Sequence, residues 1–211
     1  ILCTYKNYRK IKLIKLKKNQ KKKLNVFDFN ELKRIIFRFK PDYIINCVGL
    51  IKQLSNKQNI NKTKFLNTNL PRKLSIIAKN KNFKIIHLST DCVFSGKKGN
   101  YKESDKCDAT DLYGISKFKG EVDSKFVLNI RTSIIGHELT SSNSLLNWFL
   151  IQKEINGFEK AFFSGLTTLE LSNIIINEII IKNKISNELF HISGPKISKL
   201  GLLKIVKKIY K

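Results

Sequence analysis

The sequence predicts an α/β protein with a doubly wound parallel sheet and a small second lobe towards its C-terminal end. Two observations lead to this class. Short apolar runs rich in β-branched residues recur along the chain, and several are apolar on both faces, as buried parallel strands are. Amphipathic helical patterns alternate with these runs. Strands and helices that alternate in this way form right-handed crossovers, and ligands then bind at the carboxyl ends of the strands.

The expected elements follow in chain order. Strands are predicted at residues 1–5, 25–29, 42–48, 84–89 and 126–135, and helices at residues 30–39, 64–79 and 112–123. In the first helix, Leu32, Ile35 and Ile36 recur at the spacing that turns one face inward. After Gly136 the pattern changes to two further helices, a short strand and a terminal helix. We therefore divide the chain into a first domain, residues 1–136, and a lobe, residues 137–211.

Composition excludes several classes of protein. The chain has 211 residues and is 42% hydrophobic, which is enough for one sizeable core and too much for a disordered chain. No apolar run approaches 18 residues, so we expect no membrane partner and a cytoplasmic location. A net charge of +25 would suit nucleic acid, but the densest basic run, residues 15–23, has no aromatic side chain to stack on bases. No specific nucleic-acid partner is expected.

Metal binding is not expected either. The four cysteines form no C-x-x-C pair and the three histidines lie far apart in sequence, so we interpret the cysteines as free thiols and the histidines as packing or surface residues. The chain also lacks methionine and opens inside an apolar run, from which we expect it to be an internal part of a longer polypeptide.

The stretch "LYGISKFKGE" places Tyr113 and Lys117 on one face of a helix, four residues apart. A nearby ammonium group favours phenolate, so Lys117 is expected to lower the pKa of Tyr113. Thr90 follows the predicted strand at 84–89 and should lie at the same edge of the sheet. Ketone reduction requires such a set, because the tyrosine donates a proton to the developing alkoxide and the threonine hydrogen-bonds the carbonyl oxygen.

Longer motifs surround this pair. The segment "HLSTDCVFSGKKGNYKESDKCDATDLYGISKFKGE" resembles the S-T-D-x-V-F-x-G, Y-x-E-x-D and Y-G-x-[ST]-K-x-x-G-E motifs of extended short-chain dehydrogenase/reductases. It is most similar to the dTDP-4-dehydrorhamnose reductase group. The segments "PDYIINCVG", "FLNTNLPRKLS", "NIRTSIIG" and "FFSGLTTLELSNII" resemble further motifs of that family in the expected order. The resemblance thus covers nearly the whole chain.

This resemblance implies a Rossmann-like fold and reduction, by NADPH or NADH, of the 4-keto group of a nucleotide-linked 4-keto-6-deoxy sugar, as in surface polysaccharide assembly. The implied catalytic residues are Thr90, Tyr113 and Lys117. The implied cofactor-binding residues are Asp28, Asn46, Gly49, Asn67, Ser89, Tyr113 and Lys117. Simpler readings exist for four of these residues: Asp28 could be a helix cap, Asn67 a polar surface position, Asn46 a structural strand-end residue and Ser89 a turn residue.

Some family features have no match here. The ten glycines never take the G-x-x-G-x-x-G spacing that binds a pyrophosphate, so we expect the first βα unit of the fold to be missing and the chain alone to be inactive. Lys6 and Arg9 could meet a 2′-phosphate and favour NADP. Two alternative functions stay open, a sugar-nucleotide epimerase or dehydratase and a regulatory subunit that binds cofactor without turnover. A homodimer is also open.

Overall fold

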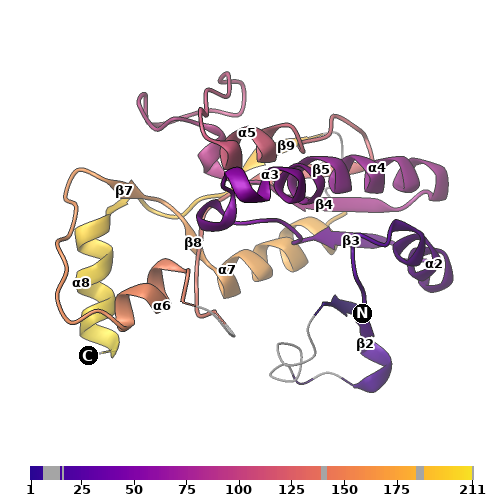
Figure 1. Ribbon diagram of the computed structural model, residues 1–211, viewed down its shortest axis with the longest axis horizontal. Helices are drawn as coiled ribbons and strands as arrows, with labels where there is room; N and C mark the ends of the chain where they lie inside the picture. Colours follow the sequence, from indigo (N-terminus) through magenta and orange to yellow (C-terminus); the bar gives the residue numbers. More distant parts are fainter. Residues whose placement is uncertain (7–14, 16, 139–141, 184–187, 211) are drawn as a thin grey trace.

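The computed structural model describes residues 1–6, 15, 17–138, 142–183 and 188–210 (Figure 1). Its main sheet has four parallel strands in the order β3-β4-β5-β9. These strands are β3 (Tyr43–Asn46), β4 (Lys84–Leu88), β5 (Val127–Arg131) and β9 (Leu189–His191). The apolar residues Ile85 and Ile86 of β4 and Val127, Leu128 and Ile130 of β5 are buried, as expected of strands covered on both faces. The predicted α/β class with a parallel sheet is confirmed.

Helices cover both faces of this sheet (Figure 1). On one face, Ile85 of β4 belongs to a core with Leu32 and Ile36 of α2 (Phe29–Phe39) and with the buried side of α4 (Leu70–Lys81). On the other face, the next residue, Ile86, packs with α7 (Thr168–Asn173) and its continuation η6 (Ile174–Ile180). Successive side chains of a strand point to opposite faces, so a short apolar run supplies both cores.

A separate parallel pair lies at the amino-terminal end of the chain, formed by β1 (Cys3–Tyr5) and β2 (Lys21–Lys23). The strand predicted at residues 25–29 is wrong. Asp28 instead begins α2, because its Oδ1 accepts from the Glu31 amide at 2.9 Å and so caps the first turn. Lys6 follows β1, while Arg9 lies outside the described residues.

The predicted helices differ from the observed ones mainly in their ends. The helix expected at residues 64–79 spans α3 (Ile60–Thr63), a π-helical segment η4 (Lys64–Asn69) and α4. The helix expected at residues 112–123 is only α5 (Leu112–Phe118). The strand expected at residues 126–135 divides into β5 and β6 (Ile134–Ile135). Short 3₁₀ turns occupy η1 (Lys18–Gln20), η2 (Lys52–Leu54), η3 (Lys57–Asn59) and η5 (Asp91–Val93).

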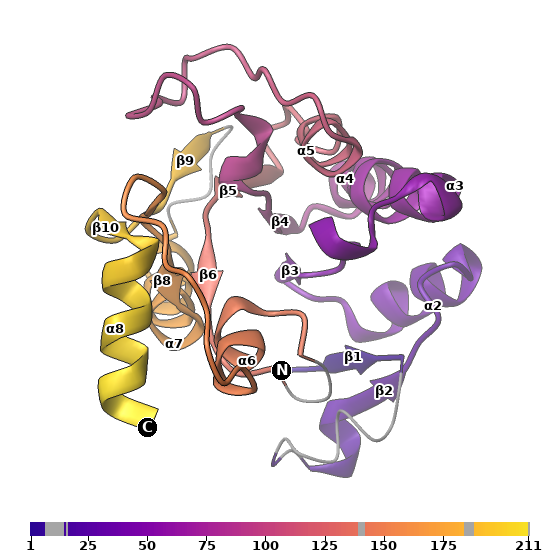
Figure 2. The same cartoon turned by 60° about the vertical axis from the view of Figure 1, so that its left-hand side comes forward.

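The part of the chain after Gly136 both extends the sheet and builds beside it. Strand β9 pairs with β5 in the main sheet, whereas α6 (Leu145–Leu150) and α8 (Lys199–Tyr210) pack on each other through Phe149 and Leu203 (Figure 2). Two further two-stranded sheets are formed here. Strand β7 (Phe162–Phe163) pairs with β10 (Ile197–Ser198), and β6 pairs with β8 (Leu166–Thr167). Among the described residues, no helix is long and apolar enough to cross a bilayer.

Candidate active site

The carboxyl ends of β3 and β4 meet at one edge of the sheet. Asn46 and His87 are partners in the β3–β4 register, so the residues that follow them lie side by side. Gly49 comes from the first of these strand ends, and Ser89 and Thr90 come from the second. All three belong to the set that the sequence predicted.

Tyr113 and Thr90 form the centre of the site. Thr90 caps the 3₁₀ turn η5, where its Oγ1 accepts from the Cys92 amide at 3.2 Å. The Thr90 side chain lies close enough to the Tyr113 hydroxyl to lower its pKa. Gly114 permits this approach, since a Cβ there would lie 2.2 Å from the Cys92 carbonyl oxygen. The start of α5 therefore packs directly on the end of β4, and the two hydroxyl groups face the same space.

The Tyr113 hydroxyl is held in its neutral form. Its pKa is raised to about 12, chiefly by burial and also by the nearby Cys92, Asp91 and Asp111, while Thr90 opposes the rise. The expectation that Lys117 lowers this pKa is wrong in the structure. The Lys117 ammonium donates instead to the Leu88 carbonyl oxygen at 2.5 Å, and burial outweighs any cation nearby. A protonated phenol is the form that a proton donor needs.

Lys117 lies beneath the edge of the sheet with 5% of its surface exposed. Burial lowers its pKa to about 8, while Glu121 and Cys47 favour the charged form. Gly49 borders it, because a Cβ on that glycine would lie 3.9 Å from Lys117 Nζ. The result is a buried cation next to a backbone that has no side chain to cover it.

Asn67 connects this lysine helix to the loop after β3. Its Oδ1 accepts from the Leu50 amide at 2.7 Å, and its Nδ2 donates to the Leu50 carbonyl at 3.1 Å and to Ser116 Oγ at 3.0 Å. The side chain is fully buried in the π-helical segment η4, a type of distortion frequent at functional sites. The reading of Asn67 as a surface position is therefore wrong.

A row of buried polar residues, Asn46, His87 and Asn129, crosses three strands in register. Asn46 Nδ2 donates to His87 Nδ1 at 3.1 Å, and Asn46 Oδ1 accepts from the Val48 amide at 3.2 Å. Asn129 makes two bonds to the backbone of Val122. Burial and the Lys117 cation lower the pKa of His87 well below its ordinary value, so the imidazole is neutral. Through these hydrogen bonds, Asn46 holds the loop after β3 and Asn129 holds the segment before β5.

A second network was missed by the sequence analysis. Ser89 Oγ donates to Glu121 Oε1 at 2.6 Å, and the buried Arg131 guanidinium donates to both oxygens of Glu121, at 2.9 and 2.7 Å. Arg131 also donates to His191 Nε2 at 3.3 Å, which leaves the imidazole Nδ1–H for the Tyr101 carbonyl at 3.2 Å. The ends of β4, β5 and β9 are thus tied together. Glu121 and Arg131 stand inside the quoted motifs, which was the available signal.

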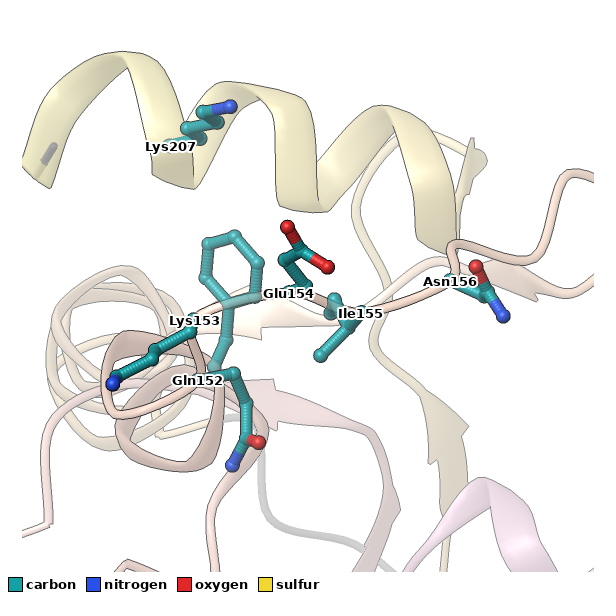
Figure 3. A pocket seen from close by; sticks show the side chains of 7 residues that line it. Gln152, Lys153, Glu154, Ile155, Asn156 and Lys207 are labelled. Carbon is teal, nitrogen blue, oxygen red and sulfur yellow. The ribbon is translucent and has the colours of Figure 1, made fainter.

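Asp28 and a hollow beside α8 are not part of this group of residues. Within the described residues Asp28 forms no hydrogen bond or ion pair with the rest of the predicted set, and its role in the fold is to cap α2. A hollow of about 580 Å³ lies between the end of α6 and α8, with Glu154 turned towards α8 (Figure 3). None of the predicted site residues line it. In the described part of the chain no cluster of His, Cys, Asp or Glu is arranged to hold a metal ion.

Comparison with known proteins identifies the family. Residues 5–142 match the family model described as the RmlD substrate binding domain. The chain belongs to this family. It is 36% identical over 88 residues to a dTDP-4-dehydrorhamnose reductase of Aggregatibacter actinomycetemcomitans, a match that covers 41% of this chain and 30% of the relative. The chain thus spans less than a third of the length of that curated relative.

Two solved structures share the fold of this family member. A hypothetical dTDP-4-dehydrorhamnose reductase from Sulfolobus tokodaii superimposes with a TM-score of 0.79 and 25% identity, over 96% of this chain and 78% of that one. The dTDP-4-dehydrorhamnose reductase of Bacillus anthracis in complex with NADP gives a TM-score of 0.75 at 20% identity, over 92% and 74% of the two chains. The second likeness concerns the fold alone.

Proposed function

We propose that this family member reduces the 4-keto group of a nucleotide-linked 4-keto-6-deoxy sugar with NADPH. The observation that carries the proposal is the neutral Tyr113 hydroxyl beside Thr90 at the carboxyl end of a parallel strand, with the buried Lys117 ammonium on the carbonyl of Leu88, the last residue of the same strand. The relative from Aggregatibacter actinomycetemcomitans is named for this kind of reaction, and the Bacillus anthracis structure was solved with NADP.

The residues present fit a nicotinamide cofactor. Parallel sheets of this class bind dinucleotides outside the carboxyl ends of their strands, where Asn46, Gly49 and Lys117 gather. Gly49 would let the cofactor approach its backbone, and the Lys117 ammonium would donate to a ribose hydroxyl. When bound, NADPH would supply the hydride for the ketone carbon. Asp28 near the adenine, Ser89 at the strand end and Lys6 near a 2′-phosphate complete the proposed cofactor set.

Proton transfer falls to Tyr113 in this proposal. The carbonyl oxygen gains negative charge as its carbon is reduced, and the Tyr113 hydroxyl gives its proton to that oxygen. The O–H bond of tyrosine breaks, the O–H bond of the alcohol forms, and a phenolate remains for solvent to reprotonate. Thr90 stabilises the oxygen by turning its hydroxyl hydrogen from Asp91 Oδ1 to that oxygen, since an alkoxide accepts more strongly than a ketone.

The wider setting is also part of the proposal. Residues 137–211 would form most of a lobe that covers the sugar, although β9 and α7 pack on the main sheet. We also propose that the protein acts in the cytoplasm, in polysaccharide assembly, as a monomer or homodimer. The finding that no described helix could cross a membrane is consistent with this location.

An epimerase or dehydratase is the second candidate. Such enzymes need acid and base groups in addition to the tyrosine, and Asp91 directly follows Thr90, whose Oγ1 donates to Asp91 Oδ1 at 3.2 Å. One carboxylate next to one threonine favours the reductase. A regulatory subunit would bind the cofactor and leave the sugar unchanged.

The test uses the polypeptide encoded by the complete reading frame that contains these residues. It is mixed with NADPH and a dTDP-4-keto-6-deoxy sugar, and NADPH absorbance and the sugar products are followed. We expect oxidation of NADPH with formation of the 4-hydroxy sugar. Epimerisation of the sugar without net NADPH loss would indicate an epimerase, formation of the 4-keto-6-deoxy sugar from the parent dTDP-hexose would indicate a dehydratase, and cofactor binding without any conversion would indicate a regulatory subunit.

A further inference from the structure

Lys52 lies at the mouth of the candidate site, on the 3₁₀ turn η2 that follows the β3 loop. Its Nζ contacts Asp111 Oδ2 at 2.8 Å, and the two side chains are 57% and 43% exposed. Asp111 caps α5 through the Gly114 amide at 2.8 Å and stands two residues before Tyr113. The ammonium group is thus held at the amino end of the helix that carries the proposed proton donor.

The same charged side chains shift the pKa values of Lys52 and Tyr113. The side-chain hydrogen bond with Asp111 raises the pKa of Lys52, and the charges of Asp111, Cys92 and Asp91 add to this rise. The same three groups raise the pKa of Tyr113. Lys52 and Tyr113 therefore share one set of neighbours, with Tyr113 on the buried side and Lys52 on the open side.

The residue after Lys52 contacts the part of the chain after Gly136. Gln53 Nε2 donates to the Asn143 carbonyl oxygen at 3.2 Å, in the segment that precedes α6. Turn η2 thus runs from the start of α5 to the part of the chain after Gly136. A nucleotide sugar whose ketone reaches Thr90 and whose nucleotide points out of the site would pass along this turn.

We propose that Lys52 binds the diphosphate of the nucleotide sugar. The diphosphate is the first anionic group that the substrate presents beyond its sugar ring. The diphosphate carries two negative charges and the Asp111 carboxylate only one, so the exposed ammonium exchanges Asp111 for the substrate. Asp111 keeps its bond to the Gly114 amide after the exchange. This inference rests on the proposed nucleotide-sugar substrate.

The next 3₁₀ turn, η3, offers the control that the test needs. Its Lys57 lies five residues after Lys52, is exposed, and forms no ion pair within the described chain. Charge-assisted bonds at exposed positions are modest, so loss of Lys52 should weaken nucleotide binding about tenfold at low salt. Lys57→Met removes the same charge from the same surface and should leave the affinity unchanged.

The measurement is the Kd of dTDP by calorimetry, on the same complete polypeptide, at low and at high salt. We expect Lys52→Met to raise the Kd about tenfold at low salt, Lys52→Arg to restore most of the affinity, and Asp111→Asn to bind at least as tightly as wild type because it frees the ammonium. Equal binding by wild type and Lys52→Met would overturn this inference alone.

Two further outcomes are informative. If Asp111→Asn weakens binding as much as Lys52→Met does, the ion pair only supports the fold, and the inference is wrong. If the wild-type protein itself does not bind dTDP, both the inference and the proposed thymidine-nucleotide substrate fail together. The two failures are therefore distinguishable.

Discussion

Glu121 is the position where a small change should cost the most stability. Replacing it with glutamine keeps the shape of the side chain and removes its charge. Glu121 accepts three hydrogen bonds, from Ser89 Oγ and from two nitrogens of Arg131, and the side chains of the ion pair are only 4% and 9% exposed. The guanidinium of Arg131 would then remain buried without a counter-charge.

The expected loss follows from that burial. Removing one partner of a buried ion pair costs about 3–5 kcal/mol, because the remaining charge has lost both its partner and its water. Glu178→Gln is the control, since Glu178 pairs with Lys182 on the surface with both side chains about half exposed, and such a change costs less than about 1 kcal/mol.

Urea unfolding followed by circular dichroism measures both variants. The Glu121→Gln midpoint should fall well below that of wild type at an unchanged slope, while the control stays near wild type. The double variant Glu121→Leu with Arg131→Met should recover part of the loss, because no unpaired charge remains buried. A Glu121→Gln loss no greater than that of the control would refute the reasoning.

Three further changes probe the site. Gly120→Ala should destabilise the chain by about 1–3 kcal/mol in urea unfolding, because its Cβ would lie 1.9 Å from the Asn67 carbonyl oxygen; an unchanged midpoint contradicts this packing. The pKa of Lys117 is about 8, so the lysine loses its charge as pH rises and kcat/KM for NADPH should fall above about pH 8. Lys117→Arg should abolish that fall, because arginine stays charged. A wild-type kcat/KM that does not change with pH would count against the role of the cation. His87→Leu leaves the Asn46 amide without its acceptor, so it should raise the KM for NADPH and lower the free energy of unfolding by about 1–3 kcal/mol. His87→Asn retains an acceptor and should recover much of both losses. Equal effects of the two variants would contradict a positioning role for His87.

The parallel sheet was predictable because its strands depend on local pattern. Runs such as Ile85 and Ile86, apolar on both faces, indicate a buried parallel strand wherever they occur. The strand expected at residues 25–29 failed for an equally local reason. There, Asp28 offers the following helix a cap, and the bond to the Glu31 amide competes with an extended backbone.

The site was only partly predictable from sequence. Thr90 and Tyr113 meet because each sits in a motif with fixed spacing from a strand or helix end. The pKa of Tyr113 could not be read from the Y-x-x-x-K spacing, since it depends on burial and on the direction taken by the Lys117 side chain. The same limit applies to the Arg131 network, whose partner His191 lies 60 residues away in sequence.

The most direct test of the account compares Tyr113→Phe with Tyr43→Phe in the NADPH oxidation assay with a dTDP-4-keto-6-deoxy sugar. Tyr43 lies at the amino end of β3, and its hydroxyl donates to Asn183 at 2.9 Å. We predict that Tyr113→Phe loses about a hundredfold or more in kcat, the usual contribution of a general acid, while Tyr43→Phe retains wild-type turnover. Wild-type turnover by Tyr113→Phe would contradict the central claim that Tyr113 is the proton donor.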